Sequence, residues 1–392
     1  MLSRRLFLGL APAWLARAAN SAENTGRRKV LVALFQRGAM DGLNAVIPFR
    51  DPHYRALRPS LAVASPLDLD GTFGLHPSLD ALKPLWDRKQ LAIVHAVGSP
   101  DPTRSHFDAQ DYMESGTPGR KATRDGWLNR ALPAEVAPAP LRAVSMGPRL
   151  PRSLRGANSA VAIAKLGDFT LRDKDSMGTL ESMYSNLREG RDTFEAMKLV
   201  ESVERAPYTP SAEYPRSPFG RNLEQLARLI KANVGVEAAF ADIGGWDTHT
   251  NESQRLPGLL SDFARTIAAF TTDLGDRFED VLLVTMSEFG RTARENGNGG
   301  TDHGHANVMF IAGGTSALRG GQVHGAWPGL APEQLYEGRD LAVTTDFRTV
   351  LGELAGKHLG VPDVSRIFPE GAGSPLGLVG RPILAAAVFQ AA

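Results

Sequence analysis

Apolar runs and polar segments alternate along the chain in a way that predicts an α/β fold. Continuous apolar runs rich in β-branched residues are typical of strands buried on both faces of a parallel sheet. Such runs occupy residues 29–35, 90–97, 141–146, 160–164, 236–243, 280–287 and 307–312. Apolar residues recur at helical spacing over 75–88, 221–233, 256–274 and 346–358, and another helix is expected to begin near Ser105. The pattern predicts a three-layer sandwich with a mostly parallel central sheet flanked by helices.

Two segments depart from this alternation. Residues 175–205 are charged with spaced apolar positions, which predicts a surface helix or hairpin. Residues 208–218 are rich in proline and are the best linker candidate, but strand and helix patterns resume directly afterwards. We therefore expect one α/β domain over residues 26–392.

The amino terminus has the layout of an export signal. Residues 3–8 are SRRLFL, an apolar stretch follows, and it ends in the small residues Ala16, Ala18 and Ala19. This order resembles a twin-arginine signal, and the alternative is an ordinary secretory signal with two chance arginines. We interpret residues 1–25 as signal and linker, which makes the twin-arginine export machinery a partner. No other stretch is long and apolar enough to cross a bilayer, so we expect a periplasmic or secreted protein.

The charge balance and the cysteine content exclude several classes of function and of site. The chain has 44 basic and 43 acidic residues, a balance that gives no support for nucleic-acid binding. It contains no cysteine, which excludes thiolate metal ligands, a cysteine nucleophile and disulfides.

Polar residues suited to metal chemistry follow several of the expected strands. In a parallel sheet the carboxyl ends of the strands share one edge, where ligands bind. The residues at these ends are Asp41, Ser105, Asp247, His249, Glu288, Asp302, His303 and His305. Carboxylates and imidazoles together are ligands for zinc, manganese or calcium, with imidazole favouring zinc. The sequence predicts a site for one or two divalent ions.

Each of these residues also has a structural explanation. Asp247 and Ser105 could cap the helices that follow them. Asp41 precedes Gly42 and could form only a turn, and Glu288 could pair with Arg291. The placement of all of them at strand ends is what favours a common site.

Several long motifs resemble the domain-of-unknown-function 1501 family, whose members often carry twin-arginine signals. The motifs are RGAMDGLN (37–44), DPHYRALRP (51–59), FGLHPSL (73–79), TRSHFDAQDYMESG (103–116), GGWDTH (244–249), SEFGRT (287–292) and GTDHGHAN (300–307). More distantly, the chain resembles the alkaline phosphatase and sulfatase superfamily. That resemblance implies an alkaline phosphatase-like sheet with a metal site of one or two ions at the strand ends.

The resemblance also implies roles for individual residues. Ser105 would be the nucleophile, and Arg104 and Arg291 would hold a tetrahedral anion. The metal ligands would be Asp41, Asp247, His249, Glu288 and His303. The chain has Glu288-Phe289 where the phosphatases have Asp-His, so Asp302 or His305 would have to replace a missing ligand.

Two functions follow from these observations. The first is an exported metal-dependent hydrolase that acts on a small phosphate or sulfate ester, or on a phosphorylated or sulfated glycan. The second is a non-catalytic periplasmic or surface protein that binds an anionic glycan or a partner on the same fold.

Overall fold

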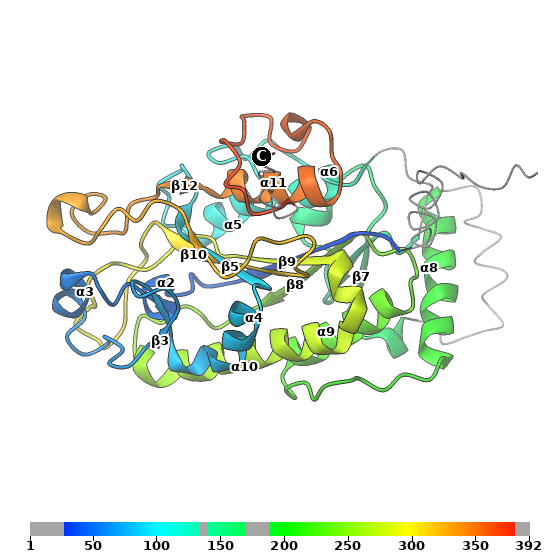
Figure 1. Ribbon diagram of the computed structural model, residues 1–392. Coiled ribbons are helices and arrows are strands. Elements are labelled where there is room, and N and C mark those ends of the chain that lie inside the picture. The colour runs from blue at the N-terminus through cyan, green and yellow to red at the C-terminus, as the bar shows by residue number, and fades with distance from the viewer. Residues whose placement is uncertain (1–26, 134–139, 170–187, 381–392) are drawn as a thin grey trace, which may run out of the picture.

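The computed structural model describes residues 27–133, 140–169 and 188–380, and a central sheet of nine strands dominates them (Figure 1). The strand order is β11-β5-β10-β9-β1-β8-β6-β7, and β12 also pairs with β5. The strands are β1 (Val30–Gln36), β5 (Leu91–Gly98), β6 (Ala143–Met146), β7 (Val161–Ile163), β8 (Ala238–Ile243), β9 (Val281–Met286), β10 (Asn307–Gly313), β11 (Val323–His324) and β12 (Thr345–Asp346).

One strand runs against the others. β10 pairs antiparallel with both β5 and β9, whereas the remaining pairs are parallel. The predicted mostly parallel sheet is confirmed. Because β10 is reversed, it begins at the edge where its neighbours end: Asn307 at its start lies opposite Val97 near the end of β5.

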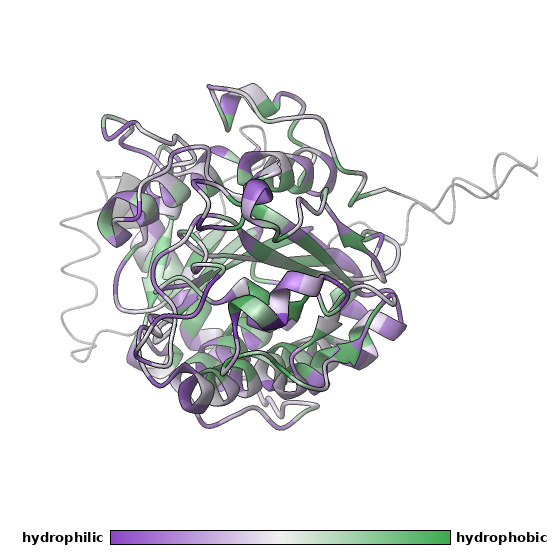
Figure 2. Ribbon diagram, turned by 90° about the vertical axis from the view of Figure 1, so that its left-hand side faces the viewer, coloured by the Kyte–Doolittle hydropathy of each residue, from purple (hydrophilic) through white to green (hydrophobic). Residues whose placement is uncertain are grey.

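Helices cover both faces of the sheet (Figure 1). One layer contains α5 (His106–Ser115), α6 (Trp127–Arg130) and α11 (Phe347–His358). The other contains α4 (Lys83–Asp87), α9 (Pro218–Lys231) and α10 (Glu252–Leu274). In the view of Figure 2 the apolar sheet lies between helices whose outer faces are hydrophilic. The predicted three-layer sandwich is confirmed.

The side chains of strand β1 pack against both helix layers. All seven of its residues are buried, and alternate side chains point to opposite faces. Val32 and Leu34 pack in the core beneath α9 and α10, and Leu31 and Phe35 pack in the core beneath α11. Full burial of an aliphatic or aromatic side chain contributes about 1.5–3 kcal/mol.

Smaller elements surround the edge of the sheet. A three-stranded sheet of order β2-β4-β3 lies beside the short helices α2 and α3, and α8 lies at the opposite end of the molecule (Figure 1). Their bounds are α2 (Gly42–Ala45), β2 (Val46–Ile47), α3 (Pro52–Leu57), β3 (Leu67–Asp68), β4 (Gly74–Leu75) and α8 (Arg188–Arg205).

Two predicted helices differ from their expected form. The segment expected as one helix over 75–88 is a 3₁₀-helix at Pro77–Leu82 followed by α4, in which Pro84 lacks a backbone donor. The segment 175–205 forms α8 from Arg188 onward, and its earlier part lies outside the described residues.

The predicted signal and linker at 1–25 also lie outside the described residues. Among the helices that the structure describes, none is long and apolar enough to cross a membrane. The expected linker at 208–218 separates β7 from β8, and strands from both sides of it join the same sheet.

Candidate metal centre

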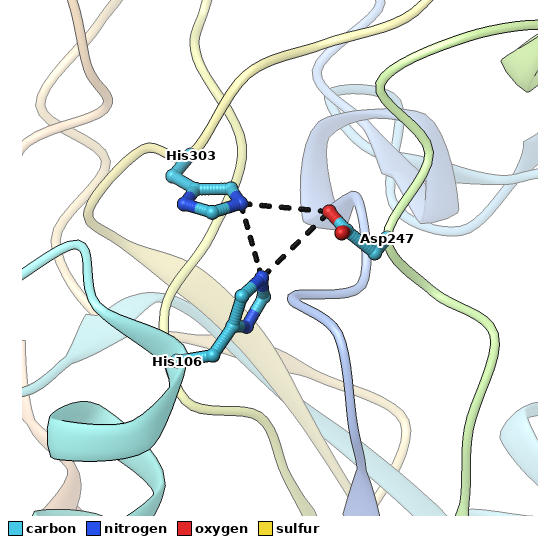
Figure 3. Close-up of side chains that lie close together, drawn as sticks. All are labelled: His106, Asp247 and His303. Carbon is cyan, nitrogen blue, oxygen red and sulfur yellow. Dashed lines mark hydrogen bonds and ion pairs between the residues drawn. The ribbon is translucent and has the colours of Figure 1, made fainter.

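Three side chains from distant parts of the chain face one another at the carboxyl edge of the sheet (Figure 3). His106 is the first residue of α5, Asp247 follows β8, and His303 precedes the reversed strand β10. His106 Nε2 lies 3.0 Å from His303 Nε2. Asp247 Oδ1 lies 3.7 Å from His106 Nε2 and 3.5 Å from His303 Nε2. The three atoms surround a common point.

His249 adds a fourth donor to this group. Its Nε2 atom lies 2.9 Å from His303 Nε2 and 3.1 Å from Asp247 Oδ1. Asp247, His249 and His303 were predicted from the sequence, and the structure brings them together with His106. We call these four residues the metal cluster.

The second nitrogen of each imidazole is already occupied. His106 Nδ1 lies 2.7 Å from Glu288 Oε1, His249 Nδ1 lies 2.9 Å from Asp302 Oδ1, and His303 Nδ1 lies 2.9 Å from the Arg104 carbonyl oxygen. Carboxylates and carbonyls only accept, so each Nδ1 donates its proton. Each Nε2 atom therefore presents a lone pair, the tautomer that metal-binding histidines adopt.

Glu288 and His106 shift each other's pKa. Hydrogen bonding to Glu288 raises the pKa of His106, although partial burial opposes the shift. Burial also opposes ionisation of Glu288, but hydrogen bonds from His106 and Gln110 outweigh it and lower its pKa. Glu288 is thus an ionised, buried acceptor that fixes the orientation of His106 rather than a member of the metal cluster itself.

Arg291 holds the loops of the site together. Its fully buried guanidinium donates to the carbonyl oxygens of Gly38, Ala39, Trp246 and Thr301, and Nη2 lies 2.6 Å from Asp247 Oδ1. Burial opposes ionisation of Asp247, and the hydrogen bond from Arg291 overcomes it and lowers the pKa of Asp247. Because these contacts use its donors, Arg291 fixes the orientation of Asp247 and is not available to hold a substrate anion.

Arg104 is also engaged by protein groups. Its Nε atom donates to Asp340 Oδ2 at 3.0 Å, and Nη2 donates to Glu337 Oε2 at 2.8 Å. The structure therefore gives Arg104 a different part in the site from the one expected: its carbonyl oxygen orients His303.

Two predicted ligands lie in other surroundings. Asp41 is fully buried, and its two carboxylate oxygens accept from Nη1 and Nη2 of Arg58. His305 Nε2 donates to the Ser99 carbonyl oxygen at 3.0 Å. Neither side chain belongs to the metal cluster, because Asp41 is paired with Arg58 and His305 donates to the Ser99 carbonyl oxygen.

Ser105 and Asp302 lie next to the cluster without belonging to it. Ser105 is exposed at the N-cap of α5, and its side chain makes no capping hydrogen bond. Asp302 accepts from His249, as described above, and from Asn296 Nδ2 at 3.1 Å.

Sequence reasoning missed His106. The prediction for this segment was Ser105. The signal that could have identified His106 is its position at the first residue of a helix that follows a strand, from which an imidazole can reach the same edge.

Comparisons with known proteins add the family and a few distant likenesses. A comparison with curated proteins finds no match. The chain is similar to the crystal structure of the lipoteichoic acid synthase LtaP from Listeria monocytogenes, with 10% identity, a TM-score of 0.31, and coverage of 78% of this chain and 75% of that chain.

Two further solved structures are similar at the same level. A protein in the alkaline phosphatase superfamily from Vibrio parahaemolyticus has 10% identity and a TM-score of 0.28, with 74% of this chain and 60% of that chain covered. The phosphonate monoester hydrolase of Agrobacterium radiobacter has 13% identity and a TM-score of 0.32, with 90% and 79% covered. The family described as "Protein of unknown function (DUF1501)" matches residues 28–369, so this chain belongs to that family.

Proposed function

We propose that this protein binds one zinc-type divalent ion in the metal cluster and uses it to hydrolyse a phosphate or sulfate ester. The observation that carries the proposal is the convergence of His106 Nε2, His303 Nε2 and Asp247 Oδ1, which all lie within 4.8 Å of one another. His249 Nε2 contacts the last two of these atoms. A single proton can join only two of the three converging atoms, whereas one metal ion can be bound by all three.

The donor set fits such an ion. The contacts between donor atoms described above range from 2.9 to 3.7 Å. Bonds of about 2.0–2.1 Å to a tetrahedral zinc ion separate its ligands by about 3.3 Å. Each imidazole also has the carboxylate or carbonyl partner that metal-binding histidines use to fix their orientation.

The exposure of the cluster supports catalysis over a purely structural metal. The exposed fractions are 46% for the Asp247 side chain, 40% for His249, 25% for His106 and 24% for His303. A bound divalent ion polarises a phosphoryl or sulfuryl oxygen and stabilises the charge that develops on it. Solvent and an ester group can reach the ion at this edge of the sheet.

A cavity of about 380 Å³ opens beside the cluster and is the proposed substrate pocket. Asp302, which orients His249, lies in its wall, and Arg294 and Arg339 line it as well. The volume lies in the range of small-ligand pockets. The two guanidinium groups can hold an anionic ester, and the carboxylates of Glu295 and Asp302 lie in the same lining.

Ser105 is the proposed nucleophile. It is exposed, directly precedes His106, and its side chain caps no backbone amide of α5. Its oxygen would bond to phosphorus or sulfur while the ester oxygen leaves with the proton that the serine gives up. Water would then hydrolyse the seryl ester and restore the hydroxyl.

Hydrolysis of aryl phosphate and aryl sulfate by the mature protein tests this proposal. Ser105→Ala should lower kcat by at least about 1000-fold and keep the bound metal, whereas Ser261→Ala on α10 should leave kcat unchanged. Equal turnover by the two variants would rule out Ser105 as the nucleophile.

We also infer that the protein is exported by the twin-arginine machinery to the periplasm or beyond, from residues 3–8 (SRRLFL). Fractionation of cells that express Arg4→Lys/Arg5→Lys should find the precursor in the cytoplasm. Unchanged export of that variant would instead support an ordinary secretory signal.

One observation favours a second function, non-catalytic binding of an anionic glycan or partner. Arg104 and Arg291, the two arginines expected to hold the transferring group, are engaged by protein acceptors. If this alternative is correct, aryl esters will not be turned over, and Ser105→Ala will bind the anion as the native protein does.

A further inference from the structure

A second and larger cavity lies along α5 and shares no lining residue with the substrate pocket. Its volume is about 910 Å³, and α5, the end of β8 and the segment after β6 line it. The basic residues in its wall are Arg37, Lys121, Arg124, Arg149, Arg152 and Arg155. The acidic ones are Asp111, Glu114 and Asp242. We call this cavity the basic cleft.

Three of its basic residues are neutralised by carboxylates. Arg37 pairs with Glu114 and Asp242, Arg152 pairs with Asp111, and Lys121 pairs with Asp108. These pairs use all the acidic groups of the cleft.

The other three, Arg124, Arg149 and Arg155, have no carboxylate partner among the residues that the structure describes, and all three are exposed. Arg155 donates only to the Leu150 carbonyl oxygen. Burial lowers the pKa of Arg152, and the charge of Arg155 lowers it further, which shows how closely positive groups crowd here. Six basic residues against the four carboxylates that pair with them leave the cleft an excess of two positive charges in a concave surface, which attracts anions.

Helix α5 connects the basic cleft to the metal cluster. His106 is its first residue, and Asp111 and Glu114 lie in the wall of the cleft. At 1.5 Å per residue, these positions are about 8 and 12 Å further along the helix axis. Arg37 also donates to Gln110 at 3.0 Å, and Gln110 donates to Glu288 at 2.8 Å, the residue that orients His106. A ligand that spans both regions must be extended and carry several anionic groups.

We propose that the basic cleft binds the anionic groups of a sulfated or phosphorylated oligosaccharide, one ester of which reaches the metal cluster. This proposal rests on the proposed function for the ester that reacts, but the binding that it describes does not require a metal. Arg124, Arg149 and Arg155 contact the non-reacting sulfate or phosphate groups.

The lining of the cleft favours a glycan over a nucleic acid. Single-stranded nucleic acids bind through basic grooves whose exposed aromatic side chains stack on the bases. Phe240 is the aromatic residue in this lining, and it is only 2% exposed. Sugar hydroxyls need polar partners instead, and Thr123 and Ser145 lie in the wall.

The test is binding of a fluorescent sulfated hexasaccharide to chelator-treated full-length mature protein at low salt. The native protein should bind it at least tenfold more tightly than the desulfated hexasaccharide. Arg124→Gln/Arg149→Gln/Arg155→Gln should lose at least tenfold in affinity. A control with the same change of charge at exposed arginines elsewhere, Arg55→Gln/Arg216→Gln/Arg265→Gln, should lose less than twofold.

Equal losses in the two triple variants would overturn the proposal, because the attraction would then come from net charge alone. Binding of inorganic polyphosphate with no binding of the hexasaccharide would overturn the assignment to a glycan. Thermal unfolding of both variants checks that they fold. Metal content is measured separately. A protein that binds the hexasaccharide but no metal would contradict the proposed function and still support glycan binding by the basic cleft.

Discussion

Asp41 and Asp247 follow two neighbouring strands of the sheet, β1 and β8, and each lies against a buried arginine. Arg58 donates to both oxygens of Asp41, and both side chains are completely buried. Arg291 donates to only one oxygen of Asp247, whose side chain is 46% exposed. The first carboxylate is closed off by its counter-charge, whereas the second remains open to a further cation.

The two carboxylates also differ in the groups that surround them. Asp41 faces a second carboxylate, Glu252, whose pKa is raised to about 8 by burial and then by the charge of Asp41. Asp247 faces three imidazole nitrogens that present lone pairs. The geometry of the arginine, rather than position at a strand end, decides which of the two carboxylates stays accessible.

The largest effect is expected from removing a member of the metal cluster. Asp247→Ala and His106→Ala should each lower zinc affinity by at least about 100-fold, more than the loss typical of an outer-shell residue. Isothermal titration calorimetry measures this loss, with His324→Ala on β11 as the control. Unchanged zinc affinity in both variants would show that Asp247, like Asp41, does not bind the metal ion.

Asp41→Asn should reduce stability instead of metal affinity. Arg58 would be left as a buried charge without its partner, a change that costs about 3–5 kcal/mol. Asp247→Asn should cost about 1 kcal/mol, because its ion pair is partly exposed and screened by solvent. Denaturant unfolding of the metal-free proteins compares them, and equal destabilisation would show that Asp41 is not the more tightly held residue.

The residue that orients His106 should have an intermediate effect. Glu288→Gln removes the charge behind the imidazole and should lower zinc affinity about 10–100-fold. Glu353→Gln, a change of another acidic residue, is the control for zinc titration. An affinity like that of the native protein would mean that Glu288 does not act through His106.

The smallest effect is expected at Glu252. Its pKa is about 8 in the folded protein, above the ordinary value of 4.5, so folding favours its protonated form. Its contribution to stability is therefore greatest below pH 4.5 and is lost as the pH rises towards 8. Glu252→Gln should change the free energy of unfolding by less than about 1 kcal/mol at pH 4, because Glu252 is protonated there in both the folded and the unfolded protein.

The same substitution should make the protein more stable than the native one above pH 8, where Glu252 would have to ionise beside Asp41. Urea unfolding at pH 5, 7 and 9 measures this difference. A native protein whose stability rose from pH 5 to pH 9 relative to Glu252→Gln would show that Glu252 is ionised throughout.

The fold could be predicted because its signals are local. The buried strands β1, β5, β8 and β9 are continuous apolar runs, and the pattern of α10 has helical spacing. The reversed direction of β10 could not be predicted in this way, because a fully buried strand has the same pattern in either direction.

The site could be predicted only in part. Asp247, His249 and His303 could be predicted because a strand end precedes or follows them. The different surroundings of Asp41 and Asp247 could not be predicted, because they depend on Arg58 and Arg291, whose partners are distant in sequence. His106 was missed because its part in the cluster depends on the reversed β10, which brings His303 to the same edge.

Elemental analysis shows whether the donors of the metal cluster bind one metal ion. The purified mature protein, reconstituted with zinc and freed of excess ion, should contain one ion per chain, and His106→Ala should contain almost none. A native protein without bound metal after reconstitution with zinc, manganese or calcium, or a His106→Ala variant with full occupancy, would contradict the account.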